Sequence, residues 1–267
     1  NFLRGNKGII KAVEENMICF KNSLELLQKY LELYKDEVAA IFITPEPCFF
    51  DKNYYLKCYE LSRKYNCLFL LDEVKTGFRN EFKGFQSKLD FVPDGATFSK
   101  AMSNGYPISA VAAKEEIMAG EDFTHLSGTF DTEASCMAAS IETLNFLKNN
   151  KVNDVLKERG MYFSEKLKEI FNRYNFPAII KNDDPTAFHI IFADEYLARE
   201  FYRKSASGGV VFYCFSNVNL NYSHTYEVID YVLDICESVV KSIKSSNGKI
   251  NTEEIIDSYM YKIRITR

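Results

Sequence analysis

The chain has 267 residues, of which 46% are hydrophobic and 15% aromatic, and its formal net charge is −4. This length and apolar content allow one large domain or one and a half ordinary ones, and exclude a disordered chain. No basic run suggests binding to nucleic acid or anionic membranes, no apolar stretch reaches about 18 residues, and seven cysteines without a CxxC motif indicate free thiols in a reducing, cytoplasmic compartment.

The first half of the chain alternates between helical and extended patterns. Residues 8–20 mix strand and loop character, and helices are expected over 22–34 and 54–65 from their amphipathic spacing. Apolar runs predict strands, which fall at residues 39–45, 67–73, 95–99 and 108–113. Strands separated by helices indicate βαβ units, so the predicted fold class is α/β with a largely parallel sheet.

In the second half the alternation of strands and helices gives way to an α+β pattern. Its predicted helices cover residues 132–147, with Asp131 as N-cap, 151–174, 194–205 and 226–243. Its predicted strands cover 187–193 and 210–214, and residues 244–251 are expected to form a loop. The change in style predicts two domains, residues 1–150 and 151–267.

Two charged residues follow neighbouring strands of the predicted sheet. Asp72 ends one apolar strand and Lys100 follows another, 28 residues later. Open parallel sheets bind ligands beyond the carboxyl ends of their strands, so an acid and a lysine there can flank one ligand. By itself this spacing is a weak signal, because acids after strands are common.

The local sequences are more specific. "FLLDEVKTGFR", "PDGATFSKAMSNGYPISAV" and "LSGTFDTEASCMAAS" occur in that order. They resemble three signature segments of class III (ω-type) aminotransferases, which are pyridoxal-phosphate enzymes of fold type I. The nearest branch is similar to glutamate-1-semialdehyde aminomutase. The resemblance extends over about residues 8 to 244 and implies an incomplete large domain followed by a small α+β domain.

The resemblance assigns roles to particular residues. Asp72 matches the carboxylate that pairs with the protonated pyridine nitrogen, and a negative charge there favours the pyridinium form. Lys100 matches the Schiff-base lysine, which also carries protons during the reaction. Val74, in the same "DEV" segment, is a further cofactor-binding candidate. Thr129 matches a threonine that binds the cofactor phosphate of the neighbouring subunit, which implies a homodimer with shared active sites.

Other positions vary from the family pattern or have less specific roles. Lys75 stands where many transaminases have a glutamine. Glu133 matches an acid that is a candidate contact for the substrate amine. Glu46, in "PEP", is expected to order the site. The three histidines, His125, His189 and His224, are not spaced as a metal site, and His224 is expected to be structural.

The family lysine normally lies well past the chain midpoint, after a region that holds a Gly/Ser phosphate loop and an aromatic residue stacked on the pyridine ring. Because the matching lysine here is residue 100, the chain is expected to be the C-terminal portion of such an enzyme. The function implied is amino-group transfer between a small amino donor and a carbonyl acceptor. Aminotransferase and aminomutase share every residue named, so both remain open.

Two other readings remain alongside this one. The chain could be a degenerate, non-catalytic fold type I protein that serves as an interaction module. It could also be a carbohydrate-pathway enzyme of another class that shares only the α/β sheet. Cofactor binding separates the favoured reading from both.

Overall fold

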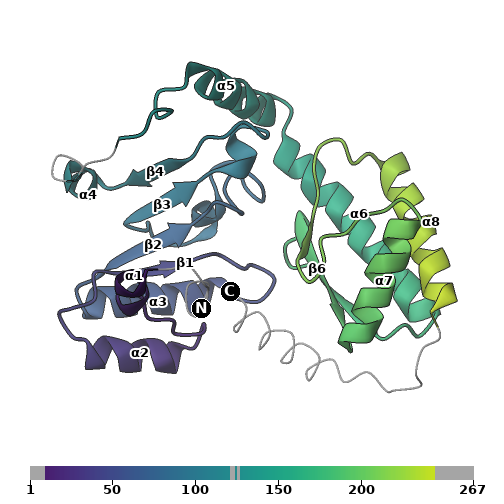
Figure 1. The fold of residues 1–267 in the computed structure, drawn as a ribbon, viewed down its shortest axis with the longest axis horizontal. Helices are drawn as coiled ribbons and strands as arrows, with labels where there is room; N and C mark the ends of the chain where they lie inside the picture. The colour runs from purple at the N-terminus through teal and green to yellow at the C-terminus, as the bar shows by residue number, and fades with distance from the viewer. Residues whose placement is uncertain (1–9, 121–123, 125–126, 244–267) are drawn as a thin grey trace.

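The computed structural model describes residues 10–120, 124 and 127–243 (Figure 1). The elements before residue 150 are α1 (Lys11–Glu15), α2 (Leu24–Leu33), β1 (Ala40–Ile43), α3 (Lys52–Lys64), β2 (Leu68–Asp72), η1 (Phe85–Lys88), β3 (Gly95–Phe98), η2 (Lys100–Met102), β4 (Ala110–Ala113), α4 (Glu115–Met118) and α5 (Ala134–Asn149). The later elements are α6 (Val152–Arg173), β5 (Ala178–Lys181), β6 (Ala187–Phe192), α7 (Glu195–Ser207), β7 (Asn217–Asn219) and α8 (Tyr226–Ser242).

The first sheet has the strand order β1-β2-β3-β4. The pairs β1–β2 and β2–β3 are parallel, whereas β4 pairs with β3 in the antiparallel sense. The parallel pairs follow from the intervening helix α3 and the long connection from β2 to β3, since parallel neighbours need a crossover. The prediction of an α/β fold with a mostly parallel sheet is confirmed.

Among the described residues, helices pack against one face of this sheet. The Asp51 carboxylate caps α3 by accepting a 3.0 Å hydrogen bond from the Tyr54 N–H, and α3 packs against β1 and β2 (Figure 1). Tyr55, Phe69 and Leu71 are fully buried between helix and sheet. Burial of each such side chain stabilises the fold by about 1.5–3 kcal/mol.

The opposite face of the same sheet carries apolar side chains that lie exposed. Phe42 on β1 is 51% exposed and Val111 on β4 is 64% exposed. Burial alternates along β1, so the neighbours of Phe42, Ile41 and Ile43, point into the core instead. The sheet therefore has one packed face and one face open to solvent.

The second sheet is antiparallel, with the order β5-β6-β7. The long helices α6, α7 and α8 pack together, and α6 and α7 also pack on its strands (Figure 1). Leu167, Phe188 and Phe201 are completely buried in this core. This arrangement confirms the expected small α+β unit, and residue 150, between α5 and α6, remains the proposed boundary.

Several predicted elements need correction. Residues 11–15 form the short helix α1, where mixed strand and loop was expected. Residues 210–214 are not a strand; the strand at this edge is β7. The four-residue strand β5 was not predicted at all. The loop expected over residues 244–251 lies outside the described residues.

The N-cap predicted for the helix α5 is also wrong. The Asp131 carboxylate accepts a hydrogen bond from the Gly128 N–H and so closes its own turn. The helix begins two residues later than expected, with Glu133 as N-cap, because the Glu133 Oε1 accepts a 3.1 Å hydrogen bond from the Ser135 N–H.

Polar contacts join the unit built around the first sheet to the unit built around the second sheet. Asn80 Nδ2 donates to the buried Asp184 carboxylate at 3.1 Å, and Asn153 Nδ2 donates to the carbonyls of Phe78 and Arg79 at 3.1 and 2.7 Å. These contacts fix the loop after β2 against the second unit. None of the helices in the described part of the chain is long and apolar enough to cross a membrane.

Candidate active site

Asp72 is the last residue of β2, at the carboxyl end of the sheet. Residues opposite it on both neighbouring strands carry hydroxyls: Thr44 Oγ1 donates to Asp72 Oδ2 at 3.0 Å, and Thr97 Oγ1 lies 3.5 Å from Asp72 Oδ1. The Val74 N–H donates to Oδ1 at 3.1 Å. The half-buried carboxylate is thus held by three neutral donors, and no basic side chain among the described residues forms an ion pair with it.

The strand register places Lys100 at the same edge of the sheet as this carboxylate. Asp72 pairs with Thr97 on β3, and Lys100 follows three residues later as the first residue of η2. Its backbone has φ 49°, a left-handed conformation that a lysine rarely adopts. The side chain is exposed, and within the described residues it has no ion pair. A carboxylate and an amine that form no ion pair in the described part of the chain therefore lie at one sheet edge.

Residues 103–106 form a tight turn after Lys100. Gly105 has φ 101°, which a glycine adopts at little steric cost. Ser103 Oγ donates to the Tyr106 carbonyl at 2.6 Å, and the Tyr106 N–H donates to the Ser103 carbonyl at 3.2 Å. This turn fixes the path of the chain away from Lys100.

Lys75 does not stand as an isolated charge. Its Nζ lies 2.6 Å from Glu46 Oε1, and His189 Nε2 of the second sheet lies 3.9 Å from Glu46 Oε2. The ring of His189 also contacts Phe49, with centroids 4.9 Å apart. Glu46 therefore compensates the charge that Lys75 introduces, and both groups help to join the two units.

The loop that carries Thr129 lies before α5. Thr129 is exposed, and no hydrogen bond in the described parts of the chain joins it to Asp72 or Lys100. Glu133, the predicted substrate contact, caps α5, and its hydrogen bonds with Ser135 lower the pKa of its carboxyl group. Within this chain the loop thus forms a separate part of the predicted site.

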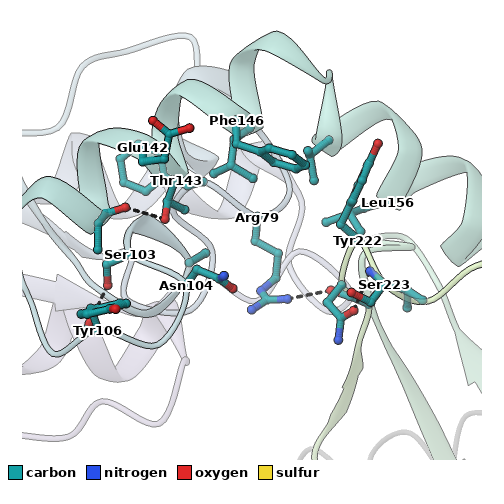
Figure 2. A pocket seen from close by; sticks show the side chains of 17 residues that line it. Arg79, Ser103, Asn104, Tyr106, Glu142, Thr143, Phe146, Leu156, Tyr222 and Ser223 are labelled. Atoms are coloured by element: carbon teal, nitrogen blue, oxygen red, sulfur yellow. Dashed lines mark hydrogen bonds between the residues drawn. The ribbon is translucent and has the colours of Figure 1, made fainter. Parts of the chain in front are cut away.

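A cleft of about 810 Å³ lies between η2, α5 and the loop 220–223 (Figure 2). Phe146 and Tyr222 meet edge to face across its rim, with ring centroids 5.3 Å apart. The cleft is lined by Ala101 and Ser103, next to Lys100, but not by Lys100 or Asp72. It is therefore a neighbour of the predicted site and not the site itself.

Arg79 was not predicted, although it belongs to the quoted "TGFR" sequence. Its Nη1 donates to the Leu220 carbonyl at 3.0 Å (Figure 2). Its Nε donates to the Lys75 carbonyl at 3.3 Å. Burial lowers the pKa of this guanidinium, and the charge of Asp184 partly opposes that effect. Arg79 therefore ties the loop after Asp72 to the second unit.

The histidines take different positions. The Asn221 N–H donates a hydrogen bond to His224 Nδ1, and the Asn221 side chain lies within hydrogen-bond distance of His224 Nε2. Burial lowers the pKa of the His224 imidazole. His125 lies outside the described residues. The described parts of the chain contain no group of three or more His, Cys, Asp or Glu side chains that could hold a metal ion.

A model of the family described as aminotransferase class III matches residues 5–241 of this chain. The chain is 32% identical over 227 residues to the 2′-deamino-2′-hydroxyneamine transaminase of Streptomyces kanamyceticus, a match that covers 84% of this chain and 57% of the relative. It is 26% identical over 262 residues to the glutamate-1-semialdehyde 2,1-aminomutase of Caldivirga maquilingensis, covering 89% and 61%.

Solved structures agree in fold. The internal aldimine form, with PLP, of the FumI protein from Sphingopyxis sp. MTA144 matches with a TM-score of 0.82 and 21% identity, over 90% of this chain and 60% of that one. An ornithine aminotransferase from Plasmodium yoelii matches with a TM-score of 0.71 and 26% identity, over 83% and 62%. The chain thus spans about three fifths of the length of these relatives.

Proposed function

Because the chain belongs to the class III aminotransferase family, whose cofactor is pyridoxal phosphate, we propose that the protein containing it transfers amino groups between a small amino donor and a carbonyl acceptor. The observation that carries the proposal is the placement of the Asp72 carboxylate and the Lys100 amine at one edge of the sheet, with no ion pair on either group in the described residues. Aminotransferase and aminomutase relatives both support it, and both activities remain within the proposal.

The residues at this edge fit the cofactor. Within the described residues the half-buried Asp72 carboxylate has neutral hydrogen-bond partners and no ion pair, so a pyridinium nitrogen would supply a compensating positive charge. The exposed Lys100 amine is available to bond the cofactor covalently. When bound, the cofactor withdraws electron density from the substrate carbon, which is chemistry that side chains alone do not supply.

The chain's own groups have three tasks in this proposal. Asp72 holds a proton on the pyridine nitrogen by its negative charge, and the Val74 N–H orients the carboxylate. The Lys100 amine would carry a proton between the substrate Cα and C4′ of the cofactor. Glu133 remains a proposed contact for the substrate amine.

We propose that the protein containing this chain functions as a homodimer. Thr129 has a hydroxyl and an N–H that both suit a phosphate oxygen, and it is exposed without contact to its own Asp72 or Lys100. An exposed anion-binding loop of this kind is suited to the site of a second subunit. Cytoplasmic localisation stays part of the proposal.

Covalent trapping tests the function directly. Full-length protein mixed with pyridoxal phosphate is expected to absorb visible light and, after borohydride reduction, to carry the cofactor on Lys100 in a peptide map. The variant Lys100→Arg should lose the adduct, whereas Lys83→Arg, at an exposed position, should keep it. An adduct on another lysine would refute the role of Lys100. Absence of any binding would favour the non-catalytic interaction module.

A further inference from the structure

Glu73, the residue after Asp72, is fully buried, although it is a carboxylate. Oε2 accepts hydrogen bonds from the Phe85 N–H at 2.7 Å and from Thr76 Oγ1 at 2.9 Å, and Oε1 accepts one from the Gln86 N–H at 2.8 Å. No basic side chain forms an ion pair with it in the described residues. Burying such a group is costly unless its hydrogen bonds are made, so these contacts are needed to hold it in place.

The backbone of Glu73 is fixed as firmly as its side chain. Its N–H donates to the Thr97 carbonyl at 2.9 Å, and its carbonyl accepts a 2.7 Å hydrogen bond from the Gly77 N–H. Both neighbours of Glu73 belong to the predicted site: Asp72 precedes it, and Val74, whose N–H contacts the Asp72 carboxylate, follows it. The position of Glu73 therefore sets where that N–H points.

The turn that receives the Glu73 carboxylate is shaped for it. Gly84 has φ 79°, and a Cβ placed there would lie 2.8 Å from Glu73 Oε1. Any other residue would thus be strained and would also push the carboxylate out of its place. The close approach lets the N–H groups of Phe85 and Gln86 both reach the carboxylate.

From these contacts we infer that Glu73 is a positioning residue, which anchors the end of β2 to the 84–86 turn and thereby holds the Asp72 carboxylate in the orientation that binds the cofactor. The inference rests on the proposed function. Glu73 does not touch the cofactor; it acts through the Val74 N–H and Asp72.

A double-mutant cycle tests this inference through the affinity of the full-length protein for pyridoxal phosphate, measured by equilibrium titration. In Glu73→Gln an amide NH2 must face at least one backbone N–H of the turn, so a hydrogen bond is lost. The change is expected to weaken binding about tenfold, equivalent to about 1.4 kcal/mol. In an Asp72→Asn background the same change should have less than about a twofold effect, because the carboxylate that it orients is gone.

Controls separate the possible outcomes. Glu81→Gln, in the same loop but paired with Lys88 and Lys157, should leave cofactor affinity unchanged. If Glu73→Gln does not fold, Thr76→Val replaces it in the cycle, since it removes one donor and keeps the carboxylate, with about a threefold loss expected. Equal losses in both backgrounds, or no loss in either, would overturn the inference alone. A wild-type protein that binds no pyridoxal phosphate would overturn the proposed function and the inference with it.

Discussion

Asp72 and Thr97 lie directly opposite each other on the parallel strands β2 and β3, and the Thr97 hydroxyl is 3.5 Å from the Asp72 carboxylate. This register brings Lys100, which follows β3 as the first residue of η2, to the sheet edge where the carboxylate lies. The hydroxyls of Thr97 and Thr44 orient the carboxylate without neutralising it. In the described part of the chain the charge of Asp72 is therefore not balanced by an ion pair.

Asp72→Asn should fold normally and lose most of the turnover of the full-length enzyme. An amide cannot stabilise a protonated pyridine nitrogen as a carboxylate does, and each pK unit of lost basicity corresponds to about 1.4 kcal/mol. We expect kcat to fall about ten- to a thousandfold in steady-state assays. Asp90→Asn, at an exposed position, serves as the control. Wild-type turnover in Asp72→Asn would refute the proposed role of Asp72 in the site.

Mixed dimers test the proposed role of Thr129. Full-length Lys100→Ala and Thr129→Ala subunits should each be weakly active alone. If Thr129 serves the opposite subunit, one site of a mixed dimer carries both defects and the other carries neither, so activity should partly return after subunit exchange. Mass spectrometry verifies the exchange. Exchange without recovered activity would place Thr129 in its own subunit's site or in none.

Asp94 directly precedes β3, at the end of the sheet opposite Asp72, and should make the free energy of unfolding depend on pH. Burial raises the pKa of its carboxyl group, but hydrogen bonds from Lys114, the Phe69 N–H and Arg63 outweigh this, so the pKa is lower than normal. Its stabilisation is thus present above the unfolded-state pKa of about 3.9 and is lost as the pH falls through the lower folded value.

Asp94→Asn is therefore expected to reduce the free energy of unfolding by about 1–2 kcal/mol at pH 7, a modest figure because both cations reach solvent. Urea unfolding should show the difference shrinking towards pH 3. Asp36→Asn, an exposed site, should show no such pH dependence. A constant difference at all pH values would mean that the Asp94 charge is not the cause.

Gly160, inside α6, is a packing position. A Cβ there would lie 1.9 Å from the Pro185 carbonyl oxygen, so Gly160→Ala must push α6 away from the 184–186 turn. Alanine favours the helix by about 1 kcal/mol, but the overlap should outweigh this and cost a net of about 1–3 kcal/mol. Thermal unfolding measures the change, with Gly120→Ala, which has open space around it, as control. An unchanged melting temperature would show that the turn moves freely.

Much of the first unit could be predicted because its signals are local. Apolar runs located β1, β2 and β3, and the parallel register of β2 and β3 brings Asp72, which ends β2, and Lys100, which follows β3, to the same sheet edge. The role of Glu73 could not be predicted in this way. Its partners lie 12 and 13 residues later in a turn whose geometry depends on Gly84, and nothing in the strand pattern distinguishes it from a surface acid.

The errors have physical causes as well. Residues 210–214 have high β-propensity, yet Val211 and Tyr213 are each 83% exposed in a loop, and the polar "NVN" segment of β7 pairs with β6 instead. The β-propensity of a segment predicts poorly whether it forms a strand when packing against neighbouring strands determines the outcome. The buried contact of Asn80 with Asp184 spans 104 residues and belongs to no sequence pattern.

The solvent-facing side of the first sheet, with Phe42 and Val111, has a practical consequence for laboratory work. Exposed apolar strands invite self-association, so the 267-residue chain expressed by itself should elute early from a size-exclusion column, and more so as concentration rises. Mild detergent should reverse this behaviour. A solubility screen of this stretch alone would then reject it because it self-associates, although its two hydrophobic cores are well packed.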